Sequence, residues 1–162
     1  NNKQIIVLTH QRALLTYMFE AIEHRGFATC GYYVGGMKPA ALEESEGKQI
    51  VLATYAMAAE ALDIKTLSTL VMASPKTDIT QSVGRILRVR GNNPLVVDLI
   101  DPHEHFMNQW NARRAFYKKN GYRIFTSNSE TYKSMTDTNW RLSHDPNAPV
   151  KKEAKNKCLI KF

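Results

Sequence analysis

The sequence predicts an α/β protein with a doubly wound, mostly parallel sheet. Short apolar runs alternate with segments of helical periodicity, and glycine or proline marks several boundaries between them. Repeated strand–helix units of this kind form parallel sheets, because each helix returns the chain to the same edge of the sheet. The expected strands are 4–9, 27–34, 49–54, 69–73, 94–100 and 122–126, and the expected helices are 10–25, 39–45, 56–62, 79–88 and 102–120.

The first strand and helix show the pattern clearly. Residues 4–9 form a continuous apolar run, which is typical of a strand buried on both faces. Thr9 is the expected N-cap of the next helix, in which apolar residues such as Leu15 and Ile22 recur at helical spacing. Gly26 is expected to end that helix, because glycine commonly follows the last helical turn.

The last expected helix has start and stop signals of its own. Asp101 is the expected N-cap, with Pro102 at the first helical position and Glu104 at the third. Gly121 is expected to stop it. Aromatic residues on one stripe are expected in the core: Phe106, Trp110 and Tyr117. Four basic residues are expected on its solvated surface, with phosphate binding as the alternative: Arg113, Arg114, Lys118 and Lys119.

Composition sets the broad class of protein. The chain has 162 residues, 43% hydrophobic and 23% charged, which is ordinary for a globular protein with a sizeable core. No apolar run approaches the roughly 18 residues needed to span a bilayer, so no membrane partner is expected. Two cysteines do not make a disulfide framework and favour a reducing, intracellular compartment. The net charge of +7 favours a polyanionic partner.

Residues 81–88 (QSVGRILR) are the most informative segment. In a helix Arg85 and Arg88 are neighbours on one face, three residues apart. Two guanidiniums directed at one point form a planar clamp for phosphate oxygens. Gln81 lies one turn earlier and can add an amide hydrogen bond, and Gly84 allows close approach of a ligand or backbone. The alternative is an ordinary solvated face of an amphipathic helix.

Several runs together resemble the second half of superfamily 2 helicases and translocases. Residues 49–65 (QIVLATYAMAAEALDIK) and 69–75 (TLVMASP), followed by 81–88, resemble motifs V and VI. Residues 5–12 (IIVLTHQR) resemble motif IV, and 31–38 (GYYVGGMK) resemble the strand and loop that follow it. The pattern is most similar to helicases of phages and large DNA viruses, including the asfarvirus and poxvirus types linked to transcription. One departure is Ala61, where the family usually has glycine.

This resemblance implies the second of two RecA-like lobes. Residues 1–126 are expected to form this domain, and 127–162 a C-terminal extension that is partly flexible, with a loosely held tail from Asp145 onward. By resemblance, Arg85 and Arg88 reach the γ-phosphate of ATP, and Gln81 supports the same phosphate or the attacking water. Asp63 contacts the nucleotide ribose or couples the two sites, with a plain helix cap as its alternative. Gly84 and Glu60 complete the expected nucleotide side, although Glu60 is equally suited to ordering the loop.

Another group of residues is expected to contact the nucleic-acid backbone. The resemblance places the hydroxyl of Thr54 against it, although a plain β-forming residue is the alternative. His10 and Arg12 open a helix, where N–H groups and the helix dipole favour an anion. Gly36 allows close approach of the backbone, and Lys38 supplies charge. Such contacts position a strand without selecting its sequence.

The sequence lacks the parts that hold a nucleotide. It contains no GxxxxGK[ST] phosphate loop and no acidic pair after a strand. ATP and Mg²⁺ are therefore expected mainly on an N-terminal lobe of the same polypeptide, and this chain alone should be inactive. No resident metal is expected, because His103 and His105 lack the spacing of a helical metal site.

Three alternatives to an unwinding motor remain open at this stage. They are a nucleic-acid-binding module without motor activity, a translocase that moves on duplex without unwinding it, and an unrelated enzyme for a small phosphorylated substrate. The expected partner is DNA or RNA, and a monomer is expected. If the source is viral, the expected location is the host cytoplasm or the virion.

Overall fold

The structure is a computed structural model that describes residues 4–60, 64–80, 83, 94–130 and 139–148. The chain divides into two compact units, Asn1–Arg114 and Ala115–Phe162. The first unit contains a parallel sheet and the second a two-stranded sheet. No helix in the described ranges is long and apolar enough to cross a membrane.

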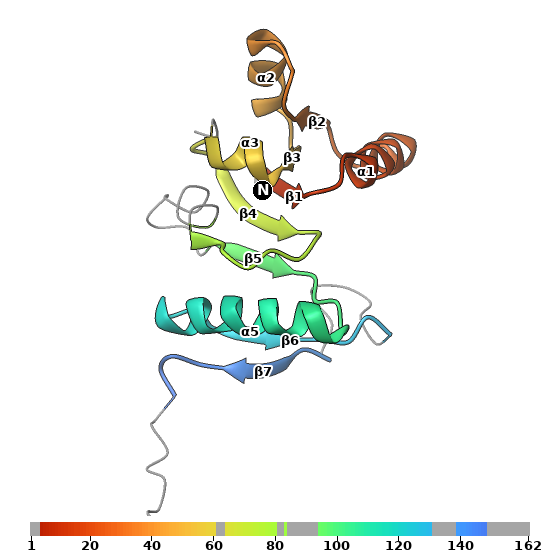
Figure 1. The fold of residues 1–162 in the computed structure, drawn as a ribbon. Helices are drawn as coiled ribbons and strands as arrows, with labels where there is room; N and C mark the ends of the chain where they lie inside the picture. The colour runs from red at the N-terminus through yellow and green to blue at the C-terminus, as the bar shows by residue number, and fades with distance from the viewer. Residues whose placement is uncertain (1–3, 61–63, 81–82, 84–93, 131–138, 149–162) are drawn as a thin grey trace, which may run out of the picture. The chain divides into compact units, whose positions relative to one another are not determined.

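The larger sheet has five strands in the order β2-β3-β1-β4-β5 (Figure 1), and every neighbouring pair is parallel. The predicted doubly wound parallel sheet is therefore confirmed. Each strand lies within or close to an expected apolar run, although β2 and β5 are shorter than expected. The bounds are β1 Gln4–Thr9, β2 Cys30–Tyr33, β3 Ile50–Thr54, β4 Leu67–Met72 and β5 Leu95–Asp98.

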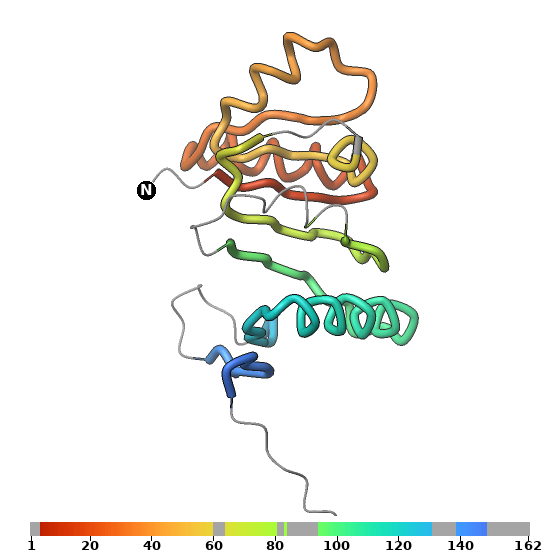
Figure 2. Tube along the Cα trace, turned by 90° about the vertical axis from the view of Figure 1, so that its left-hand side faces the viewer, coloured from red at the N-terminus to blue at the C-terminus, as the bar shows by residue number. Residues whose placement is uncertain are grey.

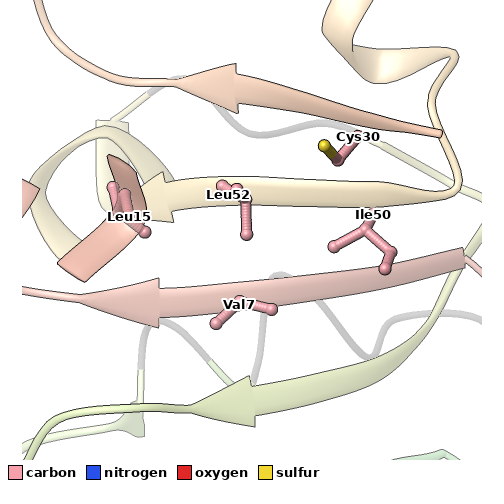
Figure 3. Packing of buried hydrophobic residues seen from close by; sticks show 5 residues of the cluster. All are labelled: Val7, Leu15, Cys30, Ile50 and Leu52. Carbon is pink, nitrogen blue, oxygen red and sulfur yellow. The ribbon is translucent and has the colours of Figure 1, made fainter. Parts of the chain in front are cut away.

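Both faces of this sheet are covered. Helix α1 (Arg12–Arg25) and helix α3 (Tyr55–Glu60) lie on opposite sides of it (Figures 1 and 2). Because side chains alternate between the faces of a strand, each central strand contributes to two layers of core. Figure 3 shows the layer under α1, formed by Val7, Leu15, Cys30, Ile50 and Leu52. Among the described residues, the fully buried Ile6, Leu8, Val51 and Leu70 alternate with this layer along the strands.

Cys30 is part of this core. Its thiol donates to Glu23 Oε1 at 3.4 Å, and Cys30 is a free cysteine. Burial, with a smaller contribution from that hydrogen bond, raises the pKa of the thiol to about 11. The residue therefore acts as a small apolar side chain and not as a nucleophile.

Helix α1 begins later than the sequence predicted. Its first residue is Arg12 and its N-cap is Gln11, which makes no side-chain capping bond. Thr9 is instead the last residue of β1, paired with Thr54 of β3, and its hydroxyl accepts the N–H of Gln11 at 3.2 Å. The prediction of Thr9 as N-cap is wrong, because its backbone belongs to the sheet. Gly26 ends the helix at φ 60°, as predicted.

Helix α2 (Pro39–Glu46) packs closely on β2. A Cβ atom added to Gly31 would lie 2.8 Å from Ser45 Oγ and 3.0 Å from its Cα. Ser45 is itself buried, and its hydroxyl donates to the carbonyl of Ala41 at 2.9 Å. Glycine at position 31 is therefore required by the approach of the helix to the strand.

Gly31→Ala is expected to destabilise the fold by about 1–3 kcal/mol, because the added methyl must push α2 off the strand. Urea denaturation of the chain measures the change. Gly47→Ala is the matched control, since its added Cβ would lie 3.4 Å from Glu44 O, an ordinary contact. Equal stability of the two variants would contradict this account of the packing.

Helix α5 (Glu104–Lys119) also starts later than predicted. The carboxylate of Asp101 accepts the N–H of His103 at 2.9 Å, and the carbonyl of His103 accepts the N–H groups of Phe106 and Met107. Asp101 thus forms a turn before the helix, and its prediction as N-cap is wrong. Gly121, at φ 74°, follows the end of the helix, as predicted.

The second unit contains a short antiparallel pair. Strand β6 (Ile124–Thr126) lies within an expected strand, and β7 (Arg141–His144) was not expected. β7 is only four residues long and three of them are polar, so its sequence carries no periodic signal. The predicted flexible tail falls mostly on residues 149–162, which lie outside the described residues.

Candidate nucleic-acid interface

The expected catalytic segment falls largely outside the part of the chain that the structure describes. Glu60 ends α3, and nothing is described of its side chain. Of the arginine segment, Val83 is described: it is buried, and its N–H donates to Ile79 O at 2.8 Å, as in a helix. The predicted residues that lie outside the described ranges are Asp63, Gln81, Gly84, Arg85 and Arg88.

The expected nucleic-acid contacts lie at the carboxyl edge of the parallel sheet. His10 follows β1, Gly36 follows β2, and Thr54 is the last residue of β3. All these strands run in the same direction. Ligands of open α/β sheets bind at this edge. The structure therefore brings together segments that are up to 44 positions apart in the sequence, counted from His10 to Thr54.

Arg12 joins the first of these segments to the second. Its Nη2 donates to the carbonyl of Gly35 at 2.7 Å, and a Cβ atom on Gly35 would contact the same nitrogen at 3.5 Å. Gly36 adopts φ 88°, a conformation that side chains rarely tolerate. A guanidinium has five N–H donors, and one makes this bond. The exposed Arg12 thus orders the glycine loop and retains donors for an anion.

His10 is held from two sides. Its backbone N–H donates to Ser74 Oγ at 3.0 Å, which ties the end of β1 to the loop after β4. Its ring lies 4.6 Å from the ring of Tyr55, centroid to centroid. The imidazole is nevertheless exposed. The sequence predicted His10 at the interface, but it did not predict either of these contacts.

Thr54 has a local structural role. Its hydroxyl accepts the N–H of Met57 at 3.5 Å, which caps the first turn of α3. The side chain is half-buried. The hydroxyl can still donate its own proton, so capping and a contact to phosphate are compatible.

Lys38 lies at the end of the glycine loop as the N-cap of α2. Its carbonyl accepts the N–H groups of Ala41 and Leu42 at 3.0 and 3.1 Å, so its backbone is fixed by the helix. The side chain is exposed. Pro39 follows at the first helical position, which suits proline because that N–H has no helical partner.

Three further residues form part of this edge and were not predicted as site residues: Tyr55, Ser74 and Lys76. Tyr55 is buried and donates its hydroxyl proton to Ser74 O at 2.7 Å, and Lys76 Nζ lies 4.7 Å from the centre of its ring. Burial raises the pKa of Tyr55 well above its usual range, so the hydroxyl remains a donor. Residues 74–76 lie just after β4, which ends at Met72, and position near that strand end was the available signal.

Arg113 contradicts the prediction of a solvated basic strip on α5. Its side chain is 1% exposed and forms a bidentate pair with Asp98, with Nε–Oδ2 at 2.8 Å and Nη2–Oδ1 at 2.9 Å. Its Nη1 donates to Lys76 O at 2.8 Å. Burial is possible because Asp98, the last residue of β5, neutralises the guanidinium. Lys118 and Lys119 are exposed, as predicted.

A metal centre is not formed by the described residues. Within those ranges, no three His, Cys, Asp or Glu side chains lie close enough together to hold an ion. His103 and His105 instead make edge contacts with the ring of Phe106.

The sequence is similar to proteins from two viruses. No protein-family model matches the chain. It is 38% identical over 127 residues to "Putative ATP-dependent RNA helicase L396" of Acanthamoeba polyphaga mimivirus, covering 75% of this chain and 24% of that protein. It is 29% identical over 153 residues to "Putative ATP-dependent RNA helicase QP509L" of African swine fever virus, covering 88% of this chain and 30% of that protein. The chain thus spans less than a third of either relative.

Solved structures share the fold at low sequence identity. The C-terminal domain of the DEAD-box protein Dbp5 matches with a TM-score of 0.59 and 17% identity, covering 74% of this chain and 71% of that chain. The C-terminal part of the Fun30 ATPase domain matches with a TM-score of 0.57 and 6% identity, covering 68% of this chain and 39% of that chain. The chain is therefore a homologue of the viral helicase-named proteins, and its parallel sheet has the fold of a RecA-like C-terminal helicase domain.

Proposed function

We propose that this chain is the second motor lobe of an ATP-dependent nucleic-acid helicase or translocase. It supplies arginine fingers to an ATP site that an N-terminal lobe of the same polypeptide completes, and it grips the nucleic-acid backbone. The observation that supports this best is the convergence at the carboxyl edge. Arg12 bonds the glycine loop after β2, and His10 bonds the loop after β4.

The proposed nucleotide chemistry rests on the arginine segment. Ile79 and Val83 are buried one helical turn apart. In the helix that the sequence predicts over 79–88, Arg85 and Arg88 share the face opposite Ile79 and Val83, and we propose that this face meets the other lobe. ATP with Mg²⁺ supplies the phosphoryl group that is transferred to water. The two guanidiniums stabilise charge on its oxygens, while Gln81 orients the water or the phosphate.

The remaining predicted residues complete the cleft in this proposal. Asp63 and Glu60 contact the ribose side of the nucleotide or order the loop that does so, and Gly84 lets the phosphates approach the helix. Opening and closing of the cleft would then move the nucleic-acid contacts of the two lobes relative to each other, a hinge-type motion.

We propose RNA as the nucleic acid, because the mimivirus and African swine fever virus relatives are both named as RNA helicases. A monomer suffices for this function. The relatives are viral, so we place the activity in an infected cell. A DNA substrate, and translocation without unwinding, are outcomes that strand-displacement assays on RNA, DNA and hybrid duplexes would distinguish.

Lys38→Ala is expected to weaken binding of single-stranded RNA to this chain about fivefold, and to reduce the slope of log affinity against log salt by about 1. The reason is the loss of one exposed positive charge, carried by a residue whose backbone is held at the start of α2. Fluorescence anisotropy across a salt series measures both quantities.

Lys65→Ala is the matched control, because Lys65 is exposed but precedes β4 at the opposite edge of the sheet. Equal losses in the two variants would mean that the charge acts without a defined interface. Tight nucleotide binding by this chain, with no salt-sensitive affinity for RNA, would favour an enzyme for a small phosphorylated substrate.

A further inference from the structure

We propose that Tyr55 is a positioning residue that fixes the loop formed by residues 74–76 and thereby links the nucleic-acid contact at His10 to the arginine segment. This inference rests on the proposed function of that segment. It adds a residue that touches neither nucleic acid nor ATP and that acts through the backbone of the loop.

Tyr55 is well suited to hold a loop. It follows Thr54 directly as the first residue of α3, and its side chain is 2% exposed. The hydroxyl donates to Ser74 O at 2.7 Å, a short and well-formed bond between groups 19 residues apart. Ser74 is half-buried, and a carbonyl shielded from water that loses its donor is costly, so this bond favours one position of the loop.

Further contacts converge on the same loop and on the Tyr55 ring. His10 N–H donates to Ser74 Oγ at 3.0 Å, and the His10 ring packs on Tyr55 at 4.6 Å. Lys76 Nζ lies over the same Tyr55 ring, 4.7 Å from its centre. Arg113 donates to Lys76 O at 2.8 Å. Connecting loops are usually the mobile parts of a fold, whereas here the carbonyls of residues 74 and 76 are both bound by buried side chains.

The loop leads directly into the arginine segment. Two residues after Lys76, the carboxylate of Asp78 accepts the N–H of Thr80 at 2.9 Å, and Ile79 is buried. Any shift of the loop therefore moves the start of the segment that contains Arg85 and Arg88. Misplacement of a catalytic group by about 1 Å can lower a rate about 100-fold. His10 and Tyr55 thus connect an expected nucleic-acid contact with the position of the arginine segment.

Tyr55→Phe tests this, because it removes the hydroxyl and keeps the ring. Tyr33→Phe is the matched control: Tyr33 is also 2% exposed, and its hydroxyl donates to Glu46 Oε1 at 3.1 Å, at the distant end of α2. In the polypeptide with both lobes, Tyr55→Phe is expected to lower RNA-stimulated kcat about tenfold with the KM for ATP and the affinity for RNA unchanged. Tyr33→Phe is expected to stay within about twofold of the parent in all three.

A second measurement does not depend on ATP hydrolysis. In this chain alone, Tyr55→Phe is expected to speed amide hydrogen exchange at Thr80 and Val83 about fivefold or more, while Tyr33→Phe leaves both rates unchanged. Unchanged exchange in Tyr55→Phe would overturn the proposal, as would equal loss of kcat in the two variants. If the parent polypeptide shows no RNA-stimulated hydrolysis, the proposed function fails, and the exchange rates still decide whether Tyr55 positions the segment.

Discussion

Arg88→Ala in the polypeptide with both lobes is expected to lower kcat for ATP hydrolysis by about 10³-fold or more, and Arg85→Ala is expected to have a similar effect. Arginine fingers contribute about 10³–10⁵ in rate in nucleotide hydrolases, because they stabilise charge on the transferred phosphoryl group. The expected loss is in kcat, with a smaller change in KM, since the stabilised charge develops in the transition state. A coupled phosphate-release assay with and without RNA measures both constants.

Two controls accompany this prediction. Arg25→Ala removes an exposed arginine at the end of α1, near the amino edge of the sheet. This change is expected to alter kcat by less than about twofold. The chain described here, tested alone, is expected to show negligible hydrolysis. Nucleotide turnover by this chain that survives Arg88→Ala would contradict the assignment of the fingers.

Arg113→Met is expected to destabilise the fold by about 3–5 kcal/mol, which is the usual cost of removing one partner of a buried ion pair. The change deletes both bonds to Asp98, whose side chain is 8% exposed, and the bond to Lys76 O. A buried carboxylate then remains without its guanidinium. The free energy of unfolding in urea measures the loss.

Lys48→Met is the matched control for this change. Lys48 pairs with Glu44 at 2.8 Å, but both groups are at the surface, where solvent screens the pair. Its removal is expected to leave the urea midpoint unchanged. The double variant Arg113→Met with Asp98→Leu should recover part of the lost stability, because no buried charge remains. A single Arg113→Met variant as stable as the parent would contradict the account of the pair.

The parallel sheet could be predicted because its signals are local. A strand buried on both faces is a continuous apolar run, as in residues 4–9, and its helix is an apolar stripe that ends at a glycine, as at Gly26. Alternation of such units implies parallel strands, and parallel strands imply a common carboxyl edge. The positions of His10, Gly36 and Thr54 at that edge therefore followed from the order of the units.

Local signals were less reliable where a side chain had two possible partners. Thr9 and Asp101 both have the residue type of an N-cap, but Thr9 remains in the β1 ladder and Asp101 closes a turn before α5. The sequence identifies a residue that can cap a helix. Whether the helix begins there depends on where the hydrogen bonds of the sheet or of the turn end along the backbone.

By itself, the sequence determined the α/β class, the order of the strands along the chain and the motifs that predict a helicase lobe, because each depends on residues near one another in the chain. The tertiary structure decided which polar side chains are buried and what they hold. Arg113 reads as one of four surface cations until Asp98 and the carbonyl of Lys76 are brought to it, from 15 and 37 residues away. Tyr55 likewise reads as a strand-end aromatic until folding places Ser74 within reach of its hydroxyl. The energy of a buried polar group is set by its partners, and those partners are chosen only when distant segments meet.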